Sequence, residues 1–182
     1  MRPVLLSALC AIALAFGSTA RATTLTIGDS HELGFVTFGI PSGDTDREAY
    51  VNAMIGLPLG GSTHVVLSGH DNLVTRSNND FGSLPQPAVL LQNGTSTTID
   101  LGSGLYSYLF AKYDGPNYGA EVWFVGDLSG VITIPATGGK YGLSGWSLFG
   151  PGASTPDGGT TATLLGMALT GLAGLRARFG RK

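Results

Sequence analysis

Most of the chain consists of short segments in which apolar and polar residues alternate, separated by turn residues. Such segments, rich in β-branched and aromatic side chains and bounded by Gly, Pro, Asn or Asp, are typical of β-strands. Nine or ten short strands at roughly 10-residue spacing predict an all-β, antiparallel β-sandwich or jelly-roll-like domain. The predicted strands cover residues 23–27, 33–40, 63–67, 72–75, 88–92, 96–101, 105–113, 121–125, 131–134 and 141–149.

Three local patterns add detail to this prediction. Thr45-Asp-Arg-Glu48 fits a capping box, and apolar residues recur four positions apart after it, so we expect one short helix over about residues 46–55. Asn93-Gly94 lies between two predicted strands and predicts a tight hairpin turn. Residues 77–86 are polar, include Pro85, and predict a long loop.

The first 22 residues have the three parts of a secretory signal peptide. Arg2 is followed by an apolar segment over residues 4–16, and Ala20 and Ala22 form an A-x-A cleavage site. As a helix this segment would rise about 20 Å, less than a bilayer core of about 30 Å, so cleavage after Ala22 is favoured over a permanent anchor. Cys10 lies inside the segment, so the mature chain would contain no cysteine and no disulfide.

The last 28 residues also have three parts: a polar motif, an uncharged span and a basic end. The strongly apolar residues 162–175 predict a short transmembrane helix of about 21 Å. The basic end keeps the C-terminus in the cytoplasm, so the folded domain would face outward. The motif is Thr155, Pro156, Asp157, Gly158 and Gly159, and the basic residues are Arg176, Arg178, Arg181 and Lys182. We thus expect a signal peptide over 1–22, a β-domain over 23–154 and a sorting segment over 155–182.

This arrangement resembles the C-terminal sorting signals of the PEP-CTERM class, in the variant with a Val-Pro-Asp-Ser/Gly-Gly motif. Thr155 stands where valine is usual in that motif. The resemblance implies recognition by an exosortase, an integral membrane cysteine protease/transpeptidase of Gram-negative bacteria, which would remove the tail near the motif. It also implies an association with exopolysaccharide and biofilm matrix. A rhombosortase tail, which Gly158-Gly159 would suit, and a permanent single-pass anchor are the alternatives.

The charge of the domain narrows the class of partner. Residues 23–154 contain four basic and eleven acidic residues, a net charge of −7. A surface of that sign repels phosphate backbones, which argues against nucleic acid as a partner. Glycine makes up 29 of 182 residues and charged residues only 12%, a composition that suits an exported β-protein with many tight turns.

Few residues have the spacing of a metal or cofactor site. His31, His64 and His70 lack a third ligand at metal spacing, so we predict no metal site there. Asp44-x-Asp46-x-Glu48 alternates like a calcium loop, but acids at the start of a helix already have a role in the helix dipole. The prediction is no cofactor, with calcium at these acids as the less favoured alternative.

Catalytic and sugar-binding patterns are equally sparse. Ser68-Gly-His70-Asp71 contains the residue types of a hydrolase triad, but the chain has no Gly-x-Ser-x-Gly elbow. Aromatic residues are numerous enough for a sugar-stacking platform, although core packing explains them more simply. They are Tyr106, Tyr108, Tyr113, Tyr118, Trp123 and Trp146.

These patterns together predict an exported surface or extracellular-matrix protein that is not an enzyme. It would be anchored transiently in the inner membrane and then released to the cell surface or the exterior. A secreted carbohydrate-binding module is the alternative, and a secreted hydrolase is less favoured.

Overall fold

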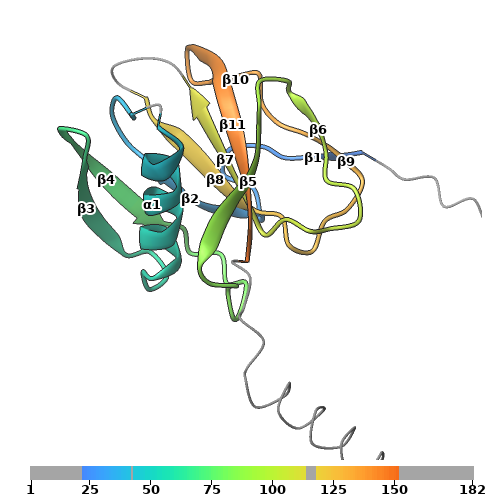
Figure 1. Ribbon diagram of the computed structural model, residues 1–182, viewed down its shortest axis with the longest axis horizontal. Coiled ribbons are helices and arrows are strands. Elements are labelled where there is room, and N and C mark those ends of the chain that lie inside the picture. Colours follow the sequence, from blue (N-terminus) through green and yellow to red (C-terminus); the bar gives the residue numbers. More distant parts are fainter. Residues whose placement is uncertain (1–21, 42, 114–117, 152–182) are drawn as a thin grey trace, which may run out of the picture.

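The computed structural model describes residues 22–41, 43–113 and 118–151 (Figure 1). The predicted transmembrane helix lies outside these residues, as does the predicted signal peptide apart from Ala22. Within the described residues, no helix has the length and apolarity needed to cross a membrane.

The described residues form eleven strands and one helix, α1 (Asp44–Ile55), so the mostly antiparallel β prediction with one short helix is confirmed. All ten predicted strands overlap an observed strand, and the short β10 was not predicted. The strands are β1 (Thr23–Thr24), β2 (Glu32–Val36), β3 (Ser62–Leu67), β4 (His70–Arg76), β5 (Ala88–Gly94), β6 (Thr98–Asp100), β7 (Tyr108–Tyr113), β8 (Ala120–Phe124), β9 (Val131–Thr133), β10 (Thr137–Gly138) and β11 (Tyr141–Pro151).

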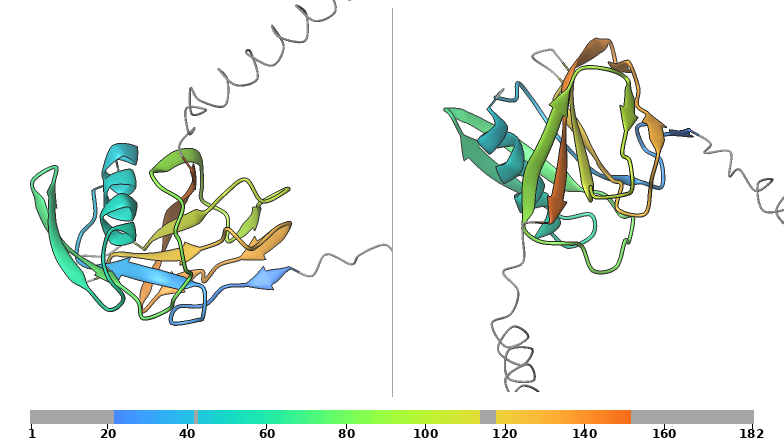
Figure 2. Two further views of the ribbon diagram at one scale, coloured as in Figure 1. Left: turned by 90° about the horizontal axis from the view of Figure 1, so that it is seen from below. Right: turned by 45° about the vertical axis from the view of Figure 1, so that its right-hand side comes forward.

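The strands make one large and one small sheet, an arrangement consistent with a β-sandwich. The large sheet has eight strands in the order β10-β11-β7-β8-β2-β4-β3, and β5 pairs along the rest of β11. The small sheet has the order β1-β9-β6. All strand pairs are antiparallel except β1 with β9. Helix α1 lies near β3 and β4, at the opposite end of the domain from the small sheet (Figures 1 and 2).

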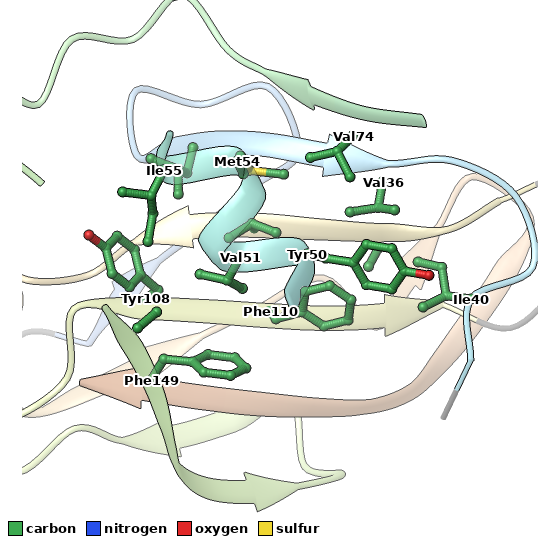
Figure 3. Close-up of a cluster of buried hydrophobic side chains, with 14 residues drawn as sticks. Val36, Ile40, Tyr50, Val51, Met54, Ile55, Val74, Tyr108, Phe110 and Phe149 are labelled. Carbon is green, nitrogen blue, oxygen red and sulfur yellow. The ribbon is translucent and has the colours of Figure 1, made fainter. Parts of the chain in front are cut away.

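The first core lies between α1 and one face of the large sheet. Four residues of α1 are buried there because the helix presents apolar side chains four positions apart to the strands (Figure 3). From the helix these are Tyr50, Val51, Met54 and Ile55, and from the sheet Val36, Val74, Tyr108, Phe110 and Phe149. This core fixes α1 across the sheet.

The second core lies on the opposite face. Along β7, Tyr108 and Phe110 belong to the first core, whereas Leu109, Ala111 and Tyr113 belong to the second. This alternation follows from the two-residue period of a strand. Ile99 and Ile132 of the small sheet cover this face, together with Leu25 directly after β1. The large sheet is therefore a central layer with a helix on one side and a short sheet on the other.

The predicted capping box is wrong. The helix begins at Asp44, two residues earlier than predicted, after Gly43, which makes no side-chain capping bond. Thr45 therefore lies within the first turn. Glu48 does not reach back to the helix start, because its Oε2 accepts the N–H of Leu90 at 3.2 Å. Glu48 therefore links α1 to β5 instead of capping the helix.

The predicted hairpin at Asn93-Gly94 is also wrong. Both residues lie inside β5, where they pair with Ser147 and Trp146 of β11, and the following strand β6 joins the other sheet. A Cβ at Gly94 would lie 2.2 Å from a ring carbon of Trp146, so this glycine makes room for the indole. A tight turn does join β3 to β4, where Ser68 and Gly69 have φ values of 49° and 80°.

Candidate functional site

An open pocket of about 390 Å³ lies against β2 and β8. Phe35 of β2 and Glu121 of β8 are directly paired across the two strands. Their neighbours Val36 and Val122 belong to the core under α1, so Phe35 and Glu121 face the other side of the sheet. The lining residues are Ile27, Glu32, Phe35, Val36, Thr37, Tyr118, Gly119, Ala120 and Glu121.

A close approach of two backbones shapes one wall of this pocket. A Cβ at Gly119 would lie 1.6 Å from the carbonyl oxygen of Val36, a distance that no side chain tolerates. Only glycine lets the start of β8 run this close to the end of β2. The residue before it, Tyr118, thereby reaches the pocket and the carboxyl group of Glu121.

Glu121 is the most unusual group of the pocket. Its side chain is 5% exposed, and its Oε1 accepts a hydrogen bond from the Tyr118 hydroxyl at 2.9 Å. Its Oε2 is buried without a hydrogen-bond partner among the described residues. Burial raises the pKa of Glu121 to about 7, the hydrogen bond from Tyr118 opposes this shift, and the nearby Glu32 adds to it. Near neutral pH this carboxyl group is therefore poised between its neutral and charged forms.

A second acid, Glu32, contributes to the negative charge of the pocket. Glu32 is half-buried, lines the pocket, and accepts the backbone N–H of Gly28. Glu32 and Glu121 are the charged residues among the described residues of the lining, and the remaining surface is largely apolar, with Phe35 and Ile27. Sequence reasoning missed this site. An acid inside the hydrophobic run of β8 was the signal that could have indicated it.

Of the histidines that were considered as metal ligands, His64 and His70 lie on the β3–β4 hairpin and His31 lies elsewhere. His64 Nδ1 lies 2.8 Å from Asp71 Oδ1 on the exposed β3–β4 hairpin. His31 Nε2 lies 3.8 Å from Asp127 Oδ2 at another place in the fold. Across residues 22–41, 43–113 and 118–151, no group of three His, Cys, Asp or Glu side chains gathers as a metal site would require.

The three acids considered for calcium have different partners. Asp44 Oδ1 accepts from Asn93 Nδ2 at 3.1 Å, Asp46 accepts from Ser68 Oγ at 3.0 Å, and Glu48 accepts from Leu90. These partners come from β5 and from the turn between β3 and β4. Each carboxylate thus links α1 to a different residue of β5 or of the turn between β3 and β4.

The residues considered as a triad are likewise not assembled. Ser68 bonds Asp46, and Asp71 bonds His64 rather than His70. Ser68 lies in the β3–β4 turn, where its positive φ serves the chain reversal. Ser68, His70 and Asp71 lie close together in the sequence because they form the end of the β3–β4 hairpin.

Most of the aromatic residues are in the core. Tyr108, Tyr113, Trp123 and Trp146 are buried, so the packing interpretation holds for these four. Tyr106 and Tyr118 are half-buried. Tyr118 is the member of the set that lines the pocket.

The tail lies outside the described residues, and so do Thr155, Ala20 and Arg176, with the rest of the predicted motif and basic end. Comparison with known families identifies the class of signal that the tail carries. A family profile described as the VPDSG-CTERM motif matches residues 156–179. The chain carries a PEP-CTERM-class C-terminal sorting signal.

The matched segment of the sorting signal begins at Pro156, one residue after the threonine that replaces the usual valine. It continues through the apolar span into the basic end. Signals of this class are recognised by exosortase-type enzymes, and the signal indicates a secreted, surface-targeted protein. The comparison with curated proteins gave no match, and neither did the comparison with solved structures.

Proposed function

We propose that this chain is an exported protein that an exosortase-type enzyme cleaves near Pro156–Gly159, releasing the β-domain to the cell surface or the extracellular matrix. The observation that carries this proposal is the match of the sorting signal over residues 156–179. The N-terminal segment supports it, because a cleavable signal peptide would place the domain outside the cytoplasm. The basic end supports the same orientation.

The domain itself acts in this proposal as a non-enzymatic component of an exopolysaccharide or biofilm matrix. Its acidic charge suits a soluble exported domain. The separate partners of Ser68 and Asp71 also support a role without hydrolytic chemistry. Cleavage after Ala22 and near residues 156–159 defines the mature form that this role requires.

Mass spectrometry of the mature protein tests the processing step. The full chain is expressed in a bacterium that carries an exosortase and in a matched strain that lacks it. We expect the extracellular form from the first strain to begin at Thr23 and to end near residues 156–159. We expect the second strain to retain Lys182 in the membrane fraction.

Two variants make this test specific to the motif. Asp157→Ala removes the acidic residue of the motif and is expected to abolish processing, whereas Asp127→Ala, at an exposed loop residue, leaves it unchanged. An extracellular form with an intact Lys182 would overturn the proposal. Cleavage that continues without the exosortase would favour a rhombosortase, and a tail retained in both strains would favour a permanent anchor.

A further inference from the structure

We propose that the pocket between β2 and β8 binds a small organic ammonium ion, a protonated amine on an apolar body, with Glu121 as its counter-ion. This inference concerns the β-domain and is independent of how the tail is processed. It is based on three features of the pocket: an unpartnered acceptor, an apolar and aromatic wall, and the sign of its charge.

The unpartnered acceptor is Oε2 of Glu121. A buried acceptor without a hydrogen bond costs stability, so native proteins rarely keep one without a reason. Oε1 of the same group is already occupied by Tyr118. Oε2 is itself buried, so an N–H group of a bound ammonium ion would reach it after a small shift of the lining side chains. It would then satisfy Oε2 with a charge-assisted hydrogen bond, which is stronger than a bond between neutral groups.

The wall of the pocket suits the rest of such a ligand. Ile27 and Phe35 offer apolar surface to an alkyl body. The rings of Phe35 and Tyr118 both border the pocket, and aromatic rings attract cations through their negative faces. The pocket volume of about 390 Å³ is within the range of small-molecule sites.

The charge of the pocket selects a cation over an anion. Glu32 and Glu121 lie in the lining, and no lysine or arginine is among the described residues that form it. A neutral sugar is disfavoured, because its several hydroxyls each need a polar partner. The other polar groups are engaged: Thr37 Oγ1 donates to the carbonyl of Leu73, and Glu32 accepts from Gly28.

Binding is coupled to a proton. Glu121 must be ionised to act as a counter-ion, and burial holds its pKa near 7, so an ammonium ion competes with a proton for this carboxyl group. The titratable groups that act on Glu121 are Tyr118 at the start of β8, Glu32 of β2 and Tyr113 of β7. Burial raises the pKa of both tyrosines, which keeps them neutral over this pH range. Affinity should therefore increase as the pH rises through 7.

The experiment compares n-butylammonium with its neutral analogue n-butanol. The full chain in a non-ionic detergent is titrated with each, and binding is followed by NMR shifts of the Phe35 and Tyr118 rings. We expect n-butylammonium to bind at least about tenfold more tightly than n-butanol at pH 8, because the charged pair contributes only with the amine. We also expect its affinity to fall by about tenfold at pH 5.

Two variants test the roles of the residues. Glu121→Gln keeps the shape and the bond from Tyr118 but removes the charge, and it should weaken n-butylammonium binding by about tenfold or more and abolish its pH dependence. Phe35→Leu keeps an apolar wall, removes the ring, and should weaken binding severalfold. Asp127→Asn is the matched control, since it removes an acid outside the pocket, and it should change neither value.

Three results would overturn the inference. Equal binding of n-butylammonium and n-butanol would show an apolar cavity without a charge preference. Unchanged binding in Glu121→Gln would exclude this carboxylate as the counter-ion. Tighter binding of a neutral monosaccharide, such as glucose, would make the pocket a carbohydrate site. None of these results bears on the processing of the tail, which the mass-spectrometric experiment tests separately.

Discussion

The core under α1 and the pocket on the other face of the large sheet bury their polar groups in different ways. Under α1, the Tyr50 hydroxyl donates to Asn72 Oδ1 at 2.7 Å, and Asn72 Nδ2 donates to the carbonyl of Thr37 at 2.9 Å. On the other face, Glu121 keeps one carboxylate oxygen without a partner among the described residues. Satisfied polar groups fix a packing arrangement, whereas an unsatisfied group costs stability and retains the capacity to bind.

Arg76 shows that the core under α1 also contains a buried charged residue, so burial of a charge alone does not distinguish it from the pocket. It is buried on the same strand as Asn72, and burial lowers its pKa. Its Nη1 donates to the carbonyl of Leu33 at 2.6 Å and its Nη2 to the carbonyl of Asn79 at 3.0 Å, while Phe81 lies against its guanidinium group. The core under α1 thus pairs this buried charge, whereas the pocket leaves Oε2 of Glu121 unpaired. Among the described residues, Nε of Arg47 in α1 is the other buried side-chain atom without a partner.

The largest expected effect comes from the core of the helix face. Phe110 is fully buried beside Tyr50, so Phe110→Ala should lower the free energy of unfolding by about 3–5 kcal/mol through lost burial and a cavity. Phe35→Ala, at the half-buried wall of the pocket, should cost less than about 2 kcal/mol. Urea unfolding followed by tryptophan fluorescence measures both. Equal losses would contradict the contrast between the packed core under α1 and the open pocket.

The next largest effect is a gain in stability that we expect from replacing Glu121, and this gain depends on pH. The folded pKa of Glu121 is about 7 and its ordinary value is 4.5. The folded state therefore holds this proton more tightly than the unfolded state. The resulting cost to stability is absent below about pH 4.5, grows as the pH rises, and is complete above about pH 7.

Glu121→Gln removes that cost. It should raise the free energy of unfolding by roughly 3 kcal/mol at pH 8 and change it little at pH 4.5, since a rise in pKa from 4.5 to about 7 costs about 1.36 kcal/mol for each pH unit between them. Urea unfolding of both proteins across this range is the measurement. A stabilisation of equal size at both pH values would show that charge is not its cause. Glu48→Gln, at an acid whose Oε2 accepts from Leu90 outside the pocket, is the control.

The smallest effect tests the satisfied network. Tyr50→Phe leaves Asn72 Oδ1 without its donor and should lower the free energy of unfolding by about 1–2 kcal/mol. The loss should be the same at pH 5 and pH 8, because burial raises the pKa of Tyr50 to about 12 and the hydroxyl stays neutral throughout. A loss that depended on pH would mean that the network contains a titrating group.

Local patterns predicted the strands well where alternation and turn chemistry agreed. β3, β4 and the long loop after Arg76 follow from such patterns, because a hairpin is built from neighbouring residues. Asn93-Gly94 failed for the opposite reason. Its local preference for a turn is overridden by pairing with β11, more than 50 residues later, and by the Trp146 ring packed over Gly94.

The pocket could not be predicted because it forms between distant segments. Alternation along β8 places Glu121 on the face opposite Val122, but it does not say whether that face is covered. Glu121 becomes buried through its cross-strand partner Phe35 and the Tyr118 hydroxyl. The sorting signal was predictable, since its motif, apolar span and basic end are contiguous in the sequence.

The position of β11 has a consequence for the order of events during secretion. It is the last of the described strands to be synthesised, yet β5, β7 and β10 all pair with it. A chain that emerges from a secretion channel amino end first cannot close its large sheet until residue 151 has passed through. The large sheet can therefore close only after the chain has emerged to within five residues of the matched sorting signal, which begins at Pro156.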